Sequence, residues 1–228
     1  RLIRSNWEQL RKAGLHLTVA ENFTAHTHLI EQLQLFEVFV ADEYLLTLDP
    51  ELASFYLIDT AINKLPHTLE HLGQIRAYGT SILSRKQITE LQKTELKVMT
   101  AELGNTLRLL DINLDKAVRY NPAAHKSLMA VSDDLAGSSR QITGLVASDI
   151  LAGRFATSPD AFLEIATAAI DRSYTQMYDS LLPTAESLVK ARIARARNTL
   201  YTSTGIALLA FLLVVYLSVS LYYAIVGS

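Results

Sequence analysis

One apolar stretch, residues 205–226, restricts what this chain can form more than any other feature. These 22 residues contain no charged residue and no Asn, Gln or Pro. A helix rises about 1.5 Å per residue, so the stretch reaches about 33 Å, enough to cross the hydrocarbon core of a bilayer. Only a helix or a closed barrel satisfies its own backbone in lipid. We therefore expect residues 204–226 to form a transmembrane helix, with Tyr201, Tyr222 and Tyr223 near its two interfaces.

The remaining composition is that of a soluble helical protein and excludes several functional classes. The net charge is −2 and the pI is about 6.3, so the chain has no electrostatic signature of nucleic-acid binding. It contains no cysteine, which excludes disulfides and thiol chemistry and disfavours a zinc site. The sequence carries no phosphate-binding glycine loop and no nucleophile motif. We therefore expect no enzymatic activity, no cofactor and no metal.

Apolar residues recur at helical spacing along almost the whole chain, which predicts an all-α protein. Three start signals are recognisable: Asp49 before Pro50, Ser84 with Gln87, and Ser158 before Pro159. The expected helices cover residues 1–13, 24–46, 49–84, 85–120, 122–152 and 159–226. Pro66 and Pro183 should kink the helices that contain them.

Short turns between such long helices predict an antiparallel bundle, with two stacked four-helix layers as an alternative. The last helix should pass from the bundle into the membrane without a break. The expected domains are therefore residues 1–203, which form the bundle, and residues 204–226, which span the membrane. In the second predicted helix, the apolar stripe comprises Leu29, Leu33, Phe36 and Val40.

Arg76 is the strongest candidate for a ligand contact. The seam Ile62, Leu65, Leu69 and Leu72 continues at Arg76, where a guanidinium is normally excluded. A buried arginine needs an anionic partner, and its two parallel donors suit a carboxylate or a planar inorganic anion. Gly79 should leave space one turn away, and Tyr56 and Tyr78 could line the same space. Arg76, Tyr56 and Tyr78 are therefore the predicted ligand-binding residues.

Two alternatives remain for these residues. The apolar stripe can step sideways to Ile75, Tyr78 and Ile82, which leaves Arg76 at the edge of the bundle. Arg76 can also form a structural ion pair with Asp59, Glu70 or Glu102. His67 and His71 lie one helical turn apart, which is metal-ligand spacing, but no third ligand accompanies them.

Several segments resemble the extracytoplasmic sensor region of bacterial methyl-accepting chemotaxis proteins. They are residues 26–30 (HTHLI), 46–57 (LTLDPELASFYL), 63–66 (NKLP) and 72–79 (LGQIRAYG). Related sensor regions occur on membrane histidine kinases and diguanylate cyclases. The resemblance covers about residues 7–84, and the later helices agree in pattern only.

The resemblance implies a periplasmic sensor anchored in the bacterial inner membrane. A small molecule, an organic acid or an inorganic anion, would bind between helices and displace the last helix. The resemblance also implies a homodimer, a further membrane helix before Arg1, and a coupling module with cytoplasmic signalling partners after Ser228. A tethering protein that binds no ligand is the alternative from another functional class.

The basic residues Lys190, Arg192, Arg195 and Arg197 precede the predicted span. Taken alone, the positive-inside rule places this end, and with it the bundle, in the cytoplasm. The receptor interpretation places it in the periplasm, with further charges beyond Ser228 setting the orientation.

Overall fold

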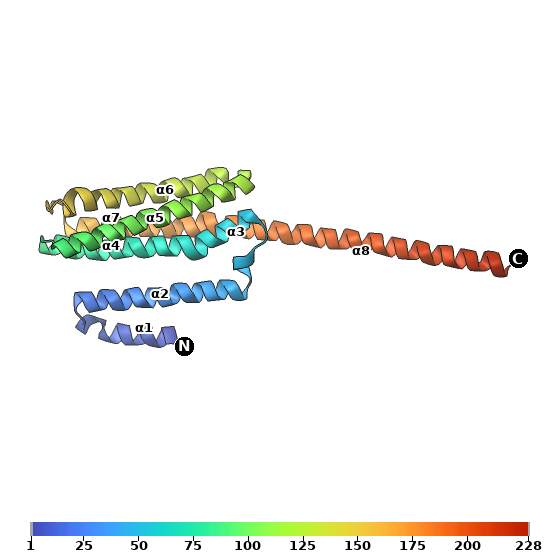
Figure 1. The fold of residues 1–228 in the computed structure, drawn as a ribbon, viewed down its shortest axis with the longest axis horizontal. Helices are drawn as coiled ribbons and strands as arrows, with labels where there is room; N and C mark the ends of the chain where they lie inside the picture. The colour runs from blue at the N-terminus through green and yellow to red at the C-terminus, as the bar shows by residue number, and fades with distance from the viewer. Residues whose placement is uncertain (1, 228) are drawn as a thin grey trace. The chain divides into compact units, whose positions relative to one another are not determined.

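The computed structural model describes residues 2–227, and these residues form an all-α structure, as predicted. The helices are α1 (Leu2–Ala13), α2 (Val19–Glu43), α3 (Leu52–Asp59), α4 (Leu65–Arg85), α5 (Glu90–Tyr120), α6 (His125–Leu145), α7 (Pro159–Gln176) and α8 (Leu182–Val226) (Figure 1). The chain divides into two compact units, one up to Ala185 and the other from Glu186 onwards.

Four helices form the core of the first unit. Helix α4 packs against α5 and α7, and α6 packs against the same two helices, so the four close into one antiparallel bundle (Figure 1). Helix α3 extends α4 and packs against α5. The four helices lie side by side, and the alternative of two stacked layers is not seen in the part of the chain that the structure describes. The fully buried core side chains include Leu72, Ile75, Ile82, Leu96, Leu103, Leu110, Leu114, Leu128 and Phe162.

Several helix starts differ from the predicted ones. Helix α5 is capped by Thr89, whose hydroxyl accepts from the Gln92 backbone N–H while the Gln92 side chain accepts from Thr89, so the cap predicted at Ser84 is wrong. Helix α4 runs past Ser84 to Arg85, and the next residue, Lys86, caps it in a left-handed conformation with φ of 50°. The N-cap predicted at Ser158 is confirmed, since its hydroxyl accepts from the Ala161 N–H.

Helices α2 and α3 also begin at positions that differ from the predicted ones. Helix α2 starts at Val19 because Thr18 and Glu21 form a capping box there. Helix α3 starts at Leu52 rather than at Pro50. Asp49 still stabilises this start, because its carboxylate accepts from the Glu51 N–H at 2.9 Å and from the Ser54 hydroxyl at 2.7 Å.

Both internal prolines follow a π-helical turn. Thr60–Lys64 precedes Pro66, and Met177–Leu181 precedes Pro183. Proline has no N–H and its ring collides with the carbonyl four residues earlier in an α-helix. A wider turn accommodates the ring, and the helix continues on both sides. One helix therefore extends over Pro159–Val226, as predicted.

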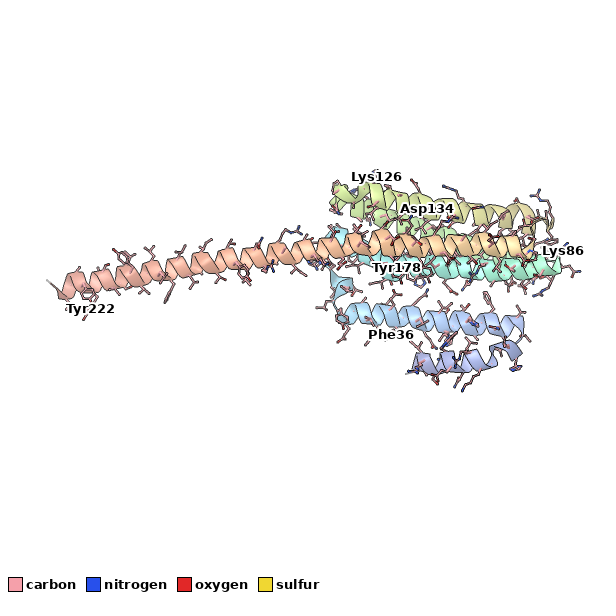
Figure 2. All side chains as sticks on the ribbon, turned by 180° about the vertical axis from the view of Figure 1, so that it is seen from behind. Phe36, Lys86, Lys126, Asp134, Tyr178 and Tyr222 are labelled. Atoms are coloured by element: carbon pink, nitrogen blue, oxygen red, sulfur yellow. The ribbon has the colours of Figure 1, made fainter. Side chains whose placement is uncertain are left out.

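Helix α2 packs less completely than the bundle helices. It contacts α1, α4 and the π-helical turn Thr60–Lys64. Of its predicted stripe only Leu29 is buried, whereas Leu33, Phe36 and Val40 keep 47, 53 and 36% of their surface exposed. Figure 2 labels Phe36 on this helix. Most of this apolar stripe is therefore exposed in the described residues.

The second unit consists of the part of α8 that begins at Glu186. The helix that ends with this segment is long and apolar enough to cross a membrane by length and composition, and none of its most apolar window is buried. The prediction that the last helix is long and apolar enough to span a membrane is therefore confirmed.

Helices α4 and α7 approach each other closely at Gly79. A Cβ atom at this position would lie 2.5 Å from Cε1 and 2.8 Å from Cζ of the Phe162 ring. Phe162 is fully buried, so its ring cannot move into solvent. The free space predicted beside Gly79 is therefore wrong, because the Phe162 ring fills it.

We expect Gly79→Ala to lower the free energy of unfolding by about 1–3 kcal/mol, because the added methyl overpacks the α4–α7 contact. Thermal unfolding of the detergent-solubilised chain, followed by circular dichroism, measures this change. Gly104→Ala is the matched control, since a Cβ atom there meets nothing within 4 Å. It should raise stability by about 0.5–1 kcal/mol through helix propensity. Equal effects at the two positions would contradict the packing account.

Asp149 organises the connection from α6 to α7. It lies in the π-helical turn Val146–Ile150, is 5% exposed, and accepts from the backbone N–H groups of Ala156 and Thr157 at 2.8 and 2.7 Å. Burial alone raises the pKa of Asp149. The hydrogen bonds from Ala156 and Thr157 and the charge of Arg154 outweigh this and hold the pKa below its usual value.

We expect Asp149→Asn to cost about 1–3 kcal/mol at neutral pH, because an amide replaces one accepting oxygen by a donor that faces backbone N–H groups. Since the folded pKa is depressed, the carboxylate contributes fully above the unfolded value of about 3.9 and loses its contribution as the pH falls through the folded pKa. The difference in the free energy of unfolding between Asp149→Asn and the wild type should therefore shrink below about pH 4. Denaturation curves at several pH values measure it, and the exposed Asp171→Asn should show no such difference.

Candidate functional site

A cleft of about 860 Å³ opens between α2, α4 and the start of α5. Its polar and aromatic lining comes from all three helices. These side chains include Phe23, His26 and Thr27 of α2, Glu70, Gln74, Arg76, Tyr78 and Arg85 of α4, and Gln92 and Glu95 of α5. The cleft thus contains two of the three predicted ligand-binding residues, Arg76 and Tyr78.

Arg76 lies at the edge of the bundle and not on its buried seam. Ile75 and Ile82 are fully buried, whereas Arg76 is partly exposed, so the apolar stripe steps sideways as in the alternative prediction. Nη1 of Arg76 donates to Oγ1 of Thr167 on α7 at 3.0 Å. The same guanidinium therefore lines the cleft and contacts α7.

The three carboxylates predicted as possible partners of Arg76 contact other residues. Asp59 contacts Lys64 at 3.3 Å, Glu102 lies 3.7 Å from His71, and Glu70 accepts from Gln74 at 2.7 Å. Within residues 2–227, no carboxylate lies within 4.0 Å of the Arg76 guanidinium. Its charge is therefore not paired within the fold and is directed to the cleft and to a neutral hydroxyl.

Tyr78 bridges α4 and α5 across one side of the cleft. Its hydroxyl donates to Glu95, and its ring lies 6.2 Å from the ring of Phe23, centroid to centroid. Burial, followed by the hydrogen bond and the charge of Glu95, raises the pKa of Tyr78 to about 12. The phenol therefore remains a protonated donor at every physiological pH.

Glu70 connects α4 to α2 on the opposite side. Burial raises the pKa of Glu70 above its usual value, even though hydrogen bonds with Gln74 and Thr27 act in the other direction. Arg85, near the end of α4, donates to the Ser81 hydroxyl at 2.7 Å. The cleft therefore combines two guanidinium groups, two carboxylates and several neutral donors. This arrangement suits a small polar ligand with a negative group that Arg76 can bind.

Tyr56 lies outside the cleft. Its ring packs edge-on against Phe55 with centroids 5.2 Å apart, and Nζ of Lys116 lies 4.8 Å above it. The structure therefore separates Tyr56 from Arg76 and Tyr78. Sequence reasoning missed Arg85, Glu95 and Thr167, since each belongs to a type that is common on helix surfaces. Their proximity depends on how α4 packs against α5 and α7.

Among the described residues, no group of three or more His, Cys, Asp or Glu side chains is arranged to hold a metal ion. His71 lies beside Glu102 at the α4–α5 contact. Burial lowers the pKa of His71, and the charge of Glu102 only partly offsets this. His71 is therefore more readily accounted for as a neutral packing residue than as half of a ligand pair.

Comparison with known protein families, with curated proteins and with solved structures finds no match. The resemblance to chemotaxis receptors consequently remains a prediction from the sequence. The functional interpretation depends on the cleft and on the helix that is long and apolar enough to span a membrane.

We expect the Tyr78–Glu95 contact to contribute about 0.5–1 kcal/mol, because both groups are only partly buried. A double-mutant cycle with Tyr78→Phe, Glu95→Gln and both changes together measures this coupling. Since the pKa of Tyr78 is raised to about 12, the coupling should persist through pH 10 and disappear as the pH rises towards 12. A coupling of zero at pH 7 would show that the two side chains do not interact in solution.

Proposed function

We propose that this chain is the ligand-sensing part of a membrane-anchored bacterial receptor. In this proposal, a small organic acid or inorganic anion binds in the cleft between α2, α4 and α5. Arg76 binds its negative group, and Tyr78 lines the cleft beside it. The helix formed by α7 and α8 crosses the membrane and carries the signal to a cytoplasmic output module.

The observation that supports this proposal is the double contact of Arg76. Its guanidinium lines the cleft and also donates to Thr167 on α7, the helix that continues without a break into the apolar segment. A ligand that binds Arg76 shares one guanidinium with Thr167, so it can reposition the group that contacts α7. Ligand binding and the position of α7 are thereby linked through a single side chain.

Such a link transmits a signal only if the ligand binds two arrangements of α7 with different affinity. Helix displacements of about 1–2 Å are typical of receptors that work in this way. The π-helical turn Met177–Leu181 lies between the Thr167 contact and the apolar segment. A shift of α7 that reached the apolar segment would have to pass through this turn.

The membrane location and the dimer are parts of the same proposal. We place the bundle in the periplasm and α8 in the inner membrane, following the chemotaxis-receptor resemblance. The exposed stripe of Leu33, Phe36 and Val40 supports a homodimer, because side chains at alternating spacings of three and four suit pairing with a second helix. The same sensor region could equally serve a histidine kinase or a diguanylate cyclase.

The direct test is isothermal titration of the detergent-solubilised chain with small mono- and dicarboxylates, nitrate, phosphate and sulfate. We expect at least one of them to bind the wild type. Arg76→Gln should weaken that binding by roughly 10- to 100-fold, because it removes a charge-assisted hydrogen bond worth about 1.5–3 kcal/mol. Arg172→Gln is the matched control, since Arg172 is exposed on α7 and bonds to the backbone oxygen of Ala168.

A second variant separates binding from transmission. Thr167→Val removes the acceptor on α7 but leaves the guanidinium in the cleft, so the anion should still bind. In this variant, binding of the anion should no longer change hydrogen exchange in residues 159–181. If no anion in the panel binds, or if Arg76→Gln and Arg172→Gln behave alike, anion sensing in this cleft is refuted and a ligand-free tether becomes the better interpretation.

A further inference from the structure

Between Glu186 and the apolar stretch, every charged residue of α8 is positive. Lys190, Arg192, Arg195 and Arg197 fall within eight residues, and no Asp or Glu occurs after Glu186. Lys190 pairs with Glu186 at 2.7 Å. The two arginines closest to the apolar stretch, Arg195 and Arg197, are both exposed. Both arginines therefore lie beyond the last acidic residue of the sequence, Glu186, and closer to the apolar stretch than Lys190 and Arg192.

The charges are distributed around the helix. Each residue turns an α-helix by about 100°, so Arg195 and Arg197 project about 200° apart, on opposite sides. Lys190 shares the side of Arg197, and Arg192 shares the side of Arg195. A partner protein that packs on one face of the helix reaches only half of these cations. A layer of headgroups that surrounds the helix reaches both sides.

The depth of the two arginines agrees with such a layer. Tyr201 is 66% exposed and lies where an interfacial aromatic residue is expected. Arg197 and Arg195 precede it by four and six residues, which is about 6 and 9 Å along the axis. The Debye length at physiological ionic strength is about 8 Å, so Arg197 lies within one Debye length of the interface and Arg195 lies at about one Debye length from it. Arg192 and Lys190, about 14 and 17 Å away, lie beyond it.

The residues between the arginines and the apolar stretch fit an interface as well. Asn198, Thr199, Thr202, Ser203 and Thr204 are polar and uncharged. The Thr202 hydroxyl donates to the backbone oxygens of Asn198 and Thr199, each at 3.0 Å, so this polar group is already satisfied by the helix itself. The Thr202 side chain can therefore enter the headgroup region without a further protein partner.

We propose that Arg195 and Arg197 bind anionic phospholipid headgroups in the leaflet at the N-terminal end of the span, from opposite sides of α8. Arg192 and Lys190 contribute less because of their distance, and Lys190 also because of its pair with Glu186. The lipids then hold the helix at a set depth. This interaction is independent of any ligand in the cleft, although it requires α8 to lie in the bilayer.

The test reconstitutes the full chain in phosphatidylcholine vesicles that contain about one per cent spin-labelled phosphatidylglycerol or spin-labelled phosphatidylcholine. Electron paramagnetic resonance measures the fraction of labelled lipid immobilised on the protein and hence the relative association constant. A cation near an anionic surface strengthens association by up to about fivefold. We expect a clear preference for phosphatidylglycerol, which should fall steeply at 1 M salt, where the Debye length is about 3 Å.

Three variants make the assignment specific. Arg195→Gln with Arg197→Gln should abolish most of the preference. Lys190→Gln with Arg192→Gln removes the same charge from the same helix, one to two turns further away, and should leave most of it. Arg195→Lys with Arg197→Lys keeps the charge and should keep the preference. Circular dichroism checks that each variant retains its helix content.

Four results would overturn the proposal. The wild type could immobilise both lipids equally, or the Arg195 and Arg197 variant could keep its preference for phosphatidylglycerol. The distant pair could prove equally important, which would indicate diffuse charge and no site at these two arginines. The fourth result is that the protein immobilises neither labelled lipid, which would show that α8 is not in the bilayer. That last result leaves anion binding measured in detergent unaffected, so the two proposals fail separately.

Discussion

The contact of Phe162 with Gly79 is the constraint on which the site depends. A phenyl ring fits against α4 only where a residue lacks a side chain, so this pair sets the register between two antiparallel helices. Arg76 lies three residues before Gly79, and Thr167 lies five residues after Phe162. The same register therefore brings Arg76 into contact with Thr167. The cleft arginine thus acquires its link to α7 from a packing contact that contains no polar atom. A shift of one turn would break both contacts together.

The prolines show how the long helices remain continuous. Pro66 and Pro183 each remove a backbone donor, yet each is preceded by a π-helical turn that makes room for its ring. The helix axis is therefore not interrupted between Thr167 and the apolar segment.

The cleft exists because α2 does not pack fully against the bundle. Its contacts with α4 include the hydrogen bond between Thr27 and Glu70, while Leu33, Phe36 and Val40 remain exposed. A helix that is held mainly at a few points leaves a cleft between itself and its neighbour. It also leaves an apolar surface of the kind that pairs with another helix.

The sequence alone predicted the helical class, the N-cap of α7 at Ser158 and the apolar last helix, because periodicity and caps are local properties. It misplaced the start of α5, because two capping signals compete near Ser84 and Thr89 and only the left-handed Lys86 decides between them. It indicated Arg76 and Tyr78 but also Tyr56, which lies elsewhere. Only the tertiary structure decided that the Phe162 ring fills the space at Gly79 and that Arg76 meets Thr167. Both depend on contacts between helices about 90 residues apart in the chain, a distance over which no periodic pattern carries information.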